Sequence, residues 1–308
     1  MTAMRGVLSP VLTPFRADLS VDAALLAAQC RWLQHHDVGA AIFGTNSEGN
    51  SLSAGERIDT LEELVAAGID PARLMPGTGA CAIDDAVAMT RACLRAGAAG
   101  VLVLPPFYYK NVGDEGLFAY FSEVVQRVGD RRLRMYLYHI PPVSQVPLGL
   151  ALIERLRARY GETIAGVKDS GGQWVHTAAL IERFAAHDFS VFAGSENFLL
   201  RTLRAGGAGC ISATANVNPG AIAALCRDWQ APDADARQQR LDQVRAIFSR
   251  FPMIAAMKSA VAQATGIADW ARVRPPLEAL DPAQESALRA AMAEAGFSMS
   301  IHYPQGES

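Results

Sequence analysis

Residues 163–172, with the sequence TIAGVKDSGG, join a short hydrophobic run to a single lysine and a Ser-Gly-Gly turn. Ile164 and Val167 are β-branched and favour a buried strand, whereas the glycines that follow end it. Lys168 is therefore expected where a strand leaves the core, and loss of hydration there disfavours the charged form of a lysine. A neutral amine can attack a keto group. For this segment alone, a solvated lysine at a strand end is the simpler alternative.

Short hydrophobic runs alternate with amphipathic stretches on both sides of this segment. About eight strand–helix units fit the chain as far as residue 220, which is the pattern of a closed (β/α)8 barrel. An open doubly wound sheet obeys the same alternation, but uninterrupted alternation followed only by helices favours the barrel. The expected strands are residues 6–15, 39–45, 73–79, 100–105, 134–140, 163–168, 190–194 and 210–215, and the expected helices are residues 22–36, 53–67, 83–96, 117–128, 148–159, 175–186 and 196–205.

The end of the chain shows a helical pattern without further strands, and prolines lie at its breaks. We therefore predict an α/β protein, a (β/α)8 TIM barrel with a C-terminal helical extension. Residues 1–220 are expected to form the barrel core. Residues 221–308 are expected to supply the last barrel helix and the C-terminal helices of the same structural unit.

The composition excludes several classes of partner. Of the 308 residues, 50% are hydrophobic and 19% are charged, so the chain can bury a large core. The net charge of -3 and the scattered Lys and Arg residues argue against a nucleic-acid partner. No unbroken apolar stretch approaches the roughly 20 residues of a membrane helix, and residues 1–15 carry no signal-like cleavage site. The five cysteines contain no C-x-x-C pair, so we expect a cytoplasmic protein.

Reactive side chains of such a barrel lie at the carboxyl ends of its strands. One amine, several hydroxyl groups and tyrosines fall at these ends. An amine can form an imine with a keto acid, phenol and hydroxyl groups can move protons, and turn N–H groups can hold a carboxylate. The candidate residues are Thr45, Asn46 and Ser47 after the second expected strand, Tyr108 and Tyr109 after the fourth, Tyr138 on the fifth, Lys168 on the sixth, Ser195 and Glu196 after the seventh, and Ser212 and Asn216 near the eighth.

Each of these residues also has an ordinary structural explanation. Residues 45–49 fit a polar loop, and Tyr138 fits a core aromatic residue whose hydroxyl reaches water. Tyr108 and Tyr109 fit packing at the rim or an oligomer contact. His139 fits a structural histidine, since alternation along the strand directs it away from Tyr138. The other histidines show no metal-binding spacing such as H-x-H or H-E-x-x-H, which disfavours a metal site.

Taken together and in order, these motifs resemble the superfamily of dihydrodipicolinate synthase and N-acetylneuraminate lyase, whose members are (β/α)8 class I aldolases. The resemblance covers nearly the whole chain, from PVLTPF at residues 10–15 to RPPL at residues 274–277. Its other landmarks are Gly44 and Thr45 with Glu48, PFYY at 106–109 with EGL at 115–117, Tyr138 with Pro141, GVK at 166–168, and GCIS at 209–212 with Asn216.

The resemblance implies a role for each matching residue. Lys168 would be the Schiff-base lysine, and Tyr138 the phenol that relays protons to and from the substrate. Thr45 would link Tyr138 to a second tyrosine, which relatives donate across a subunit contact. We place this second tyrosine at Tyr108, with Tyr109 as the alternative.

The resemblance also implies how the keto acid is bound. Backbone N–H groups of Thr45 and Asn46 would hold the pyruvate carboxylate, and the carbonyl of Ile211 would face the imine. No metal or organic cofactor is implied, since the substrate forms a covalent imine with lysine. The expected partners are a small keto acid and an aldehyde, and the expected assembly is a homo-oligomer, a dimer or tetramer.

Several positions depart from the family pattern. The synthases carry an arginine, which binds the carboxylate of the second substrate, at the position of Val143. An apolar side chain cannot form a bidentate contact with a carboxylate, which argues against lysine biosynthesis. Ser195 and Glu196 replace the Tyr-Asp pair of the sialic acid lyases. The residues expected to shape this part of the pocket are Val143, Ser144, Ser195, Glu196 and Ser212.

The resulting hypothesis is a pyruvate-dependent class I aldolase acting on a 2-keto acid, by elimination a 2-keto-3-deoxy sugar acid or a similar compound. A dehydratase of such an acid would use the same imine to expel water. A 4-hydroxy-tetrahydrodipicolinate synthase is a further alternative despite Val143. A barrel that binds keto acids without turnover is the alternative from another class, and the lysine and tyrosines count against it.

Overall fold

Seven parallel strands form one curled sheet in the computed structural model, which describes residues 3–301 and residue 303. The strands follow the order β2-β1-β7-β6-β5-β4-β3 around the sheet, so sequential neighbours are adjacent nearly everywhere. This arrangement directs all carboxyl ends to one face of the sheet. The strands are β1 (Gly6–Ser9), β2 (Gly39–Ala40), β3 (Val101–Val103), β4 (Met135–His139), β5 (Ile164–Asp169), β6 (Ser190–Ala193) and β7 (Gly209–Ile211).

The gap between β2 and β3 is closed by the segment expected to be the third strand, residues 73–79. Leu74 forms a parallel bridge with Ala40, and Gly77 forms one with Leu102. The segment forms two isolated bridges and not a continuous strand. Pro76, which lacks a backbone N–H, lies between them and interrupts the ladder. The (β/α)8 prediction is confirmed, with this one strand reduced.

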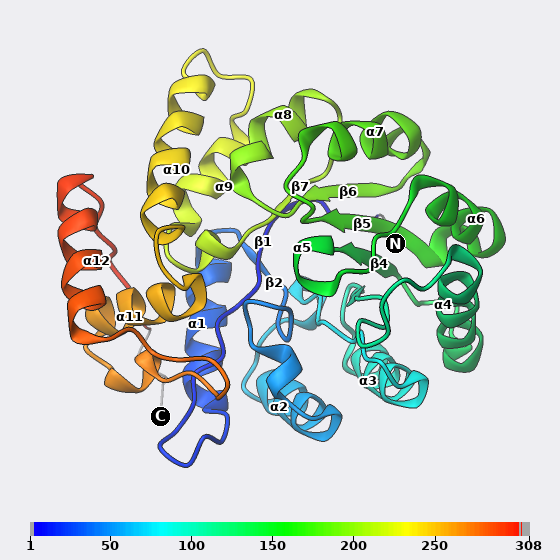
Figure 1. Cartoon of the computed structure of the whole chain (residues 1–308), viewed down its shortest axis with the longest axis horizontal. Helices are drawn as coiled ribbons and strands as arrows, with labels where there is room; N and C mark the ends of the chain where they lie inside the picture. The colour runs from blue at the N-terminus through cyan, green and yellow to red at the C-terminus, as the bar shows by residue number, and fades with distance from the viewer. Residues whose placement is uncertain (1–2, 302, 304–308) are drawn as a thin grey trace.

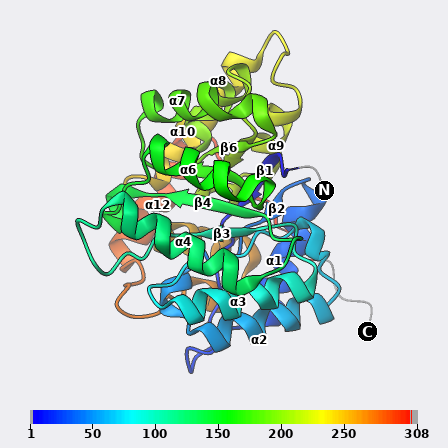
Figure 2. The same ribbon diagram turned by 90° about the vertical axis from the view of Figure 1, so that its right-hand side faces the viewer.

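Helices surround the sheet as an outer layer (Figures 1 and 2). The helix α2 (Ala54–Ala66) begins with a capping box: the Glu56 N–H donates to Ser53 Oγ over 3.1 Å, and Glu56 Oε2 accepts from the Ser53 N–H. The short helix α5 (Pro141–Ser144) was not predicted. The helices of the outer layer are α1 (Ala23–His35), α2 (Ala54–Ala66), α3 (Ile83–Ala96), α4 (Asp114–Val128), α6 (Leu150–Tyr160), α7 (Trp174–Phe184), α8 (Leu199–Arg204) and α9 (Pro219–Arg227).

Three further helices lie together on one side of the barrel, at the left of Figure 1. They are α10 (Ala234–Phe248), α11 (Met253–Thr265) and α12 (Pro282–Glu294). α10 and α11 carry side chains that reach the barrel mouth. Short 3-10 helices occur at Gly49–Ser51, Pro71–Arg73, Gly161–Thr163, Ala185–His187, Glu196–Phe198, Ala213–Asn216 and Ala268–Ala271.

Successive side chains of a strand point to opposite faces of the sheet, so the strands contribute to two hydrophobic cores. The barrel interior is filled by one cluster, to which the bridging segment contributes Met75. The larger cluster lies between the strands and the surrounding helices. Burial of each large apolar side chain stabilises the fold by about 1.5–3 kcal/mol. The interior cluster contains Leu8, Ala41, Met75, Leu102, Leu104, Tyr136, Tyr138, Ile140, Ala165, Phe192, Ala208 and Ile211.

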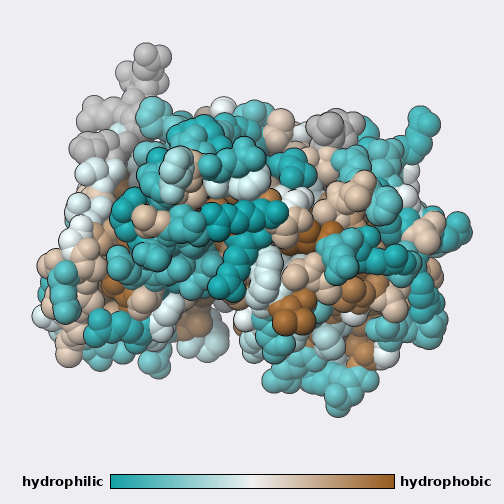
Figure 3. Space-filling model, turned by 90° about the horizontal axis from the view of Figure 1, so that it is seen from above, coloured by the Kyte–Doolittle hydropathy of each residue, from teal (hydrophilic) through white to brown (hydrophobic). Residues whose placement is uncertain are grey.

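The outer surface matches a barrel whose helices turn their polar faces to solvent. Figure 3 shows hydrophilic residues over much of the face seen from above, with hydrophobic residues visible between them. Among the described residues, none of the helices combines the length and the apolar character required to cross a bilayer.

Candidate active site

Lys168 and Tyr138 lie opposite each other on adjacent parallel strands. β4 and β5 pair Tyr138 with Lys168, while Met135 pairs with Ile164 and Tyr136 with Gly166. One extra residue in β5, a β-bulge, therefore shifts the register between these pairs. Without this shift Tyr138 would pair with Val167, whose side chain belongs to the outer core. The bulge thus places the lysine beside the phenol at the carboxyl end of the barrel.

The amine of Lys168 is buried and has a defined partner. Its side chain is 2% exposed, and Nζ donates to the Tyr138 hydroxyl over 3.1 Å. The same nitrogen lies 4.2 Å from the centre of the Tyr138 ring. Lys168 is therefore not the solvated lysine that its local sequence also allowed.

Tyr138 has an environment that favours loss of its proton. Burial by itself raises the pKa of Tyr138, but the nearby Lys168 charge and hydrogen bonds from Thr45, Lys168 and Ser170 outweigh burial and lower that pKa. The Thr45 hydroxyl lies 3.4 Å from the phenol oxygen, so either oxygen can be the donor. The arrangement can pass a proton between the amine, the phenol and the Thr45 hydroxyl.

The turn that carries Thr45 and Asn46 follows β2 and is tightly folded. The N–H groups of Ser47 and Gly49 both donate to the carbonyl of Gly44. Among the described residues, the N–H groups of Thr45 and Asn46 have no hydrogen-bond acceptor. Two adjacent free N–H groups in a turn form a site for an anion.

Glycine is required where this turn ends. A Cβ added to Gly49 would lie 2.0 Å from the carbonyl oxygen of Phe43, closer than real Cβ contacts allow. Phe43 and Glu48 both adopt the left-handed region, with φ of 62° and 55°. The strained backbone indicates that the surrounding packing holds the turn in this conformation.

A buried ion pair attaches the turn to the C-terminal helices. Glu48 follows the anion site and lies against the ammonium of Lys258 on α11, and both side chains are fully buried. Burial lowers the pKa of Lys258 to about 8, while Glu48 pulls it in the opposite direction. The second oxygen of Glu48 accepts from the Arg274 N–H over 2.8 Å. The residues that hold the turn are thus far from it in the sequence.

A cavity of about 280 Å³ opens between these groups. Two of its lining residues, Lys168 and Arg245, are cationic. No local sequence motif marks Arg245 or Met253 as a site residue, and both come from the C-terminal extension. The lining residues are Thr45, Asn46, Tyr138, Ile140, Pro142, Val143, Lys168, Asp169, Ser170, Gly172, Gly194, Ser195, Phe198, Ala213, Arg245 and Met253.

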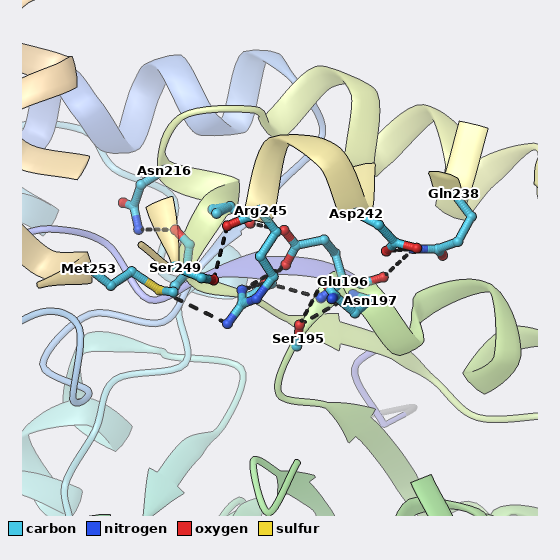
Figure 4. A network of polar contacts seen from close by, with 12 residues as sticks. Ser195, Glu196, Asn197, Asn216, Gln238, Asp242, Arg245, Ser249 and Met253 are labelled. Atoms are coloured by element: carbon cyan, nitrogen blue, oxygen red, sulfur yellow. Dashed lines mark hydrogen bonds and ion pairs between the residues drawn. The ribbon is translucent and has the colours of Figure 1, made fainter. Parts of the chain in front are cut away.

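Glu196 lies behind the cavity wall as the centre of a polar network (Figure 4). Its side chain is 1% exposed, and its carboxylate accepts hydrogen bonds from the hydroxyls of Ser212 and Thr214. Nη1 of Arg245 donates to Glu196 Oε2 over 3.0 Å. Glu196 and Ser212 therefore support the wall from behind, while Ser195 reaches the cavity itself.

Three of the predicted site residues, Tyr108, Ile211 and Val143, lie either outside the cavity lining or at the open side of the cavity. Tyr108 is 73% exposed, stacks edge-on against the exposed Tyr109, and is absent from the cavity lining. Ile211 is fully buried in the barrel interior. Val143 lines the cavity but is 59% exposed, at its open side. Within one chain, the structure brings together Lys168 and Tyr138 with Thr45 but leaves Tyr108 apart from them.

His139, Asp169 and His176 form a cluster on the opposite face of the same two strands. Their potential ligand atoms lie within 4.8 Å of one another. The Leu148 N–H donates to Nδ1 of His139, so the proton of the neutral ring lies on Nε2 and blocks that atom as a metal ligand. Burial lowers the pKa of His139 to about 4, which keeps the ring neutral at pH 7. This hydrogen bonding fits a structural cluster and does not fit a metal site.

Asp169 is satisfied by hydrogen bonds within the cluster. It accepts from the Thr177 hydroxyl over 2.7 Å and from the Gly171 N–H over 2.9 Å, and His176 Nδ1 lies 3.1 Å away. Burial raises the pKa of Asp169, but these hydrogen bonds outweigh burial and lower it. The cluster therefore anchors the loop that follows Lys168.

A closed parallel barrel with a buried lysine beside a phenol at its carboxyl face is the architecture of the class I aldolases, a class of lyases. The sequence pattern of the dihydrodipicolinate synthetase family matches residues 3–295. The chain belongs to this family and is a dihydrodipicolinate synthase-like lyase. The family resemblance predicted from the sequence is confirmed.

Relatives cover the chain almost completely. An uncharacterized DapA-like lyase of Chloroflexus aurantiacus is 35% identical over 94% of this chain and 97% of the relative. Dihydrodipicolinate synthase from Agrobacterium tumefaciens is 34% identical, with a TM-score of 0.87 over 94% of this chain and 99% of that structure. YagE of Escherichia coli K12, solved in complex with pyruvate, is 27% identical, with a TM-score of 0.86 over 95% and 99% of the two chains.

Proposed function

We propose that this lyase is a pyruvate-dependent aldolase that cleaves a 2-keto acid through an imine on Lys168. The observation that carries the proposal is the buried amine, 3.1 Å from a phenol whose pKa is lowered, beside a cavity. A buried amine with a proton acceptor in contact is suited to attack on a ketone. The pyruvate complex of the related YagE supports pyruvate as the keto-acid portion.

The proposed reaction begins with proton transfer and imine formation. Tyr138 takes a proton from Lys168 along their hydrogen bond, and the free amine attacks the keto carbon. The resulting carbinolamine loses its hydroxyl as water, to which Tyr138 returns a proton, and a protonated imine remains. Burial of both groups excludes bulk water from this exchange.

Cleavage uses the imine as an electron acceptor. Tyr138 takes the proton of the hydroxyl on C4, the bond between C3 and C4 breaks, and an aldehyde leaves. The electron pair of that bond moves into the imine to give an enamine, and the proton that Tyr138 took from the hydroxyl is returned to C3. Water then hydrolyses the imine of pyruvate and restores the Lys168 amine. Since the imine accepts the electrons, the proposed reaction uses no metal or organic cofactor.

The keto-acid carboxylate is assigned to the turn after β2. The free N–H groups of Thr45 and Asn46 support this assignment, because both line the cavity that contains Lys168. The carbonyl of Ile211 is assigned to the imine region on the family resemblance alone. Tyr108 is assigned to the active site of a neighbouring subunit. Its side chain is 73% exposed and is therefore available for a subunit contact. The proposed assembly is therefore a homo-oligomer.

The aldehyde portion is proposed to be that of a 2-keto-3-deoxy sugar acid or a similar compound. Hydroxyl groups of Thr45, Ser170 and Ser195 line the cavity and can bind a hydroxylated chain. Val143 lacks the donors with which a synthase would bind its second substrate. A dehydratase acting through the same imine is the second candidate. A dihydrodipicolinate synthase is the third candidate, because the synthase from Agrobacterium is similar to this chain.

A panel of 2-keto-3-deoxy acids tests the proposal and separates the candidates. We expect pyruvate and an aldehyde in equal amounts from the natural protein and from a Lys110→Ala control, and neither from Lys168→Ala. Lys110 is a suitable control because it is one of only three lysines in the chain. A deoxygenated keto acid without pyruvate would establish the dehydratase instead. Formation of 4-hydroxy-tetrahydrodipicolinate from pyruvate as the preferred reaction would establish the synthase.

A further inference from the structure

One arginine reaches the cavity from outside the barrel. Arg245 lies in the last turns of α10, and its side chain lines the same cavity as Lys168 and Val143. Its side chain is 18% exposed. In the described part of the chain, Lys168 and Arg245 are the only cations that line this cavity. The reaction proposed above uses the lysine and leaves the arginine without a role.

The guanidinium of Arg245 uses only part of its donor capacity. Nη1 donates to Glu196 over 3.0 Å and to the Ser212 hydroxyl over 3.3 Å. Among the described residues, the one hydrogen-bond partner of Nη2 is the sulfur of Met253, at 4.0 Å, and a thioether is a weak acceptor. Nε has no acceptor among residues 3–301 and 303. The edge formed by Nε and Nη2 is therefore free to bind an oxygen ligand.

Glu196 holds the arginine in one orientation. Its buried carboxylate is fixed by two hydroxyl groups, so the Nη1 side of the guanidinium cannot turn toward the cavity without breaking these contacts (Figure 4). A guanidinium with one side fixed and the other edge free is organised in advance for a bidentate contact. Planar carboxylate and phosphate groups match the spacing of two such N–H donors.

The chemistry of the cavity wall favours an anion over other ligands at this edge. Met253, in contact with Arg245, and Phe198 give this part of the cavity wall an apolar character. In these surroundings a charge-assisted contact is stronger than in water. The keto-acid carboxylate is already assigned to the turn at Thr45 and Asn46, so a second anion must belong to the other end of the substrate.

We propose that Arg245 selects substrates with a second anionic group, a carboxylate or a phosphate, on the portion released as aldehyde. The inference rests on the proposed function, since it assumes that an aldehyde occupies this cavity. It assigns the recognition of that portion to α10, in place of the arginine that the synthases carry at the position of Val143. In the condensation direction, the enzyme would therefore prefer anionic aldehydes.

Paired aldehydes test the inference with pyruvate as the common partner. Succinic semialdehyde is compared with butanal, and glyceraldehyde 3-phosphate with glyceraldehyde. We expect kcat/KM of the natural protein to favour the anionic member of at least one pair, and the favoured pair identifies carboxylate or phosphate. In Arg245→Met this preference should fall about 10- to 100-fold, the effect of losing a charged hydrogen bond. Arg245→Lys should restore part of the preference.

Two further variants separate recognition from structural damage. Arg240→Met removes a cation from the same helix, in a groove lined by Phe297 and away from the cavity, and should keep the preference. Arg245→Met leaves Glu196 buried without its cation, so the double variant Arg245→Met with Glu196→Gln provides a second test. The double variant should fold, as judged by its thermal unfolding, and should also lack the preference.

Three results would overturn the inference. Equal kcat/KM for the members of both pairs in the natural protein would show that no anion is selected. A preference that survives in Arg245→Met would assign the selection elsewhere. A loss of pyruvate trapping by borohydride in Arg245→Met would place the arginine at the keto-acid carboxylate. A natural protein that traps no pyruvate would instead refute the proposed function, and this inference with it.

Discussion

Tyr138 and Lys168 are paired in register across β4 and β5, and their functional atoms lie 3.1 Å apart. Paired residues on adjacent strands share one face of a sheet, here the interior of the barrel. Neither residue depends on a flexible loop for its position. The distance between the amine and the phenol is therefore set by the register of the two strands. A substitution at either residue should change the chemistry of the pair without moving the other residue.

Replacing the phenol should slow turnover without preventing folding. Tyr138→Phe keeps the ring in the barrel core and removes only the hydroxyl that exchanges protons with Lys168 and Thr45. We expect kcat for release of pyruvate to fall by about 10²- to 10⁴-fold, the range for loss of a general acid–base group. Tyr160→Phe is a matched control, since within the described part of the chain the Tyr160 hydroxyl has one hydrogen-bond partner, the exposed Gln126. Comparable losses in both variants would refute the role of Tyr138.

The lysine should control the ionisation of the tyrosine. Burial raises the pKa of Tyr138, whereas the Lys168 charge and hydrogen bond lower it. Lys168→Met removes the two lowering effects that come from the lysine and leaves burial in place, so the pKa of Tyr138 should rise. Titration of tyrosinate absorbance, with Lys168→Met/Tyr138→Phe as the blank, measures that pKa. A pKa that is unchanged or lower in Lys168→Met would contradict the described contact.

The ion pair behind the carboxylate-binding turn should be important for stability. Lys258→Met leaves Glu48 charged and fully buried without its partner, which costs about 3–5 kcal/mol. Adding Glu48→Gln removes that unpaired charge and should recover part of the loss. The free energy of unfolding, from denaturant titration of the three proteins, tests both steps. A loss in Lys258→Met below about 1 kcal/mol would show that the pair is not coupled to folding.

The same pair predicts a dependence of stability on pH. Burial lowers the pKa of Lys258 from 10.5 to about 8 in the folded protein. Between these values the unfolded chain binds more protons than the folded chain, so this group makes stability rise with pH. Below pH 8 both states are protonated and the contribution is constant. The difference in unfolding free energy between the natural protein and Lys258→Met should therefore grow from about pH 8 to pH 10, and a flat difference would contradict it.

Two glycines near the turn should respond in opposite ways to alanine. A Cβ at Gly49 meets the Phe43 carbonyl at 2.0 Å, whereas the nearest atom to a Cβ at Gly55 is the Ser53 hydroxyl at 3.9 Å. Gly49→Ala should destabilise the protein by about 1–3 kcal/mol. Gly55→Ala, on the exposed face of α2, should stabilise it by about 0.5–1 kcal/mol. Thermal unfolding of both variants measures the contrast, and equal effects would refute the described turn geometry.

The barrel could be predicted from the sequence because strand and helix patterns alternate at a regular period. The exception is informative: Pro76 reduces the expected third strand to bridges at Leu74 and Gly77, although the segment still closes the ring. Backbone pairing with Ala40 on one side and Leu102 on the other holds this segment in the sheet, although its own sequence has a weak strand propensity. The capping box of Ser53 and Glu56 was predictable because it depends on residues close in the sequence.

The candidate site was predictable only where its residues lie at strand ends. Lys168, Tyr138 and Thr45 follow from the barrel and the family motifs. The bulge in β5 was not expected, since one extra residue leaves no clear sequence signal. Arg245 and Lys258 come from helices of the C-terminal extension, and only the tertiary structure brings them to the mouth and to Glu48. The contribution of Tyr108 depends on a second subunit and stays a prediction.

Borohydride reduction in the presence of pyruvate, followed by peptide mapping, tests the central claim most directly. The chain contains three lysines, of which Lys258 is fully buried in an ion pair and Lys110 lies outside the cavity lining. We predict that the mass of one reduced pyruvate appears on the peptide with Lys168 and is lost in Lys168→Ala. Modification of Lys110 or Lys258 in its place, or no modification at all, would contradict the account.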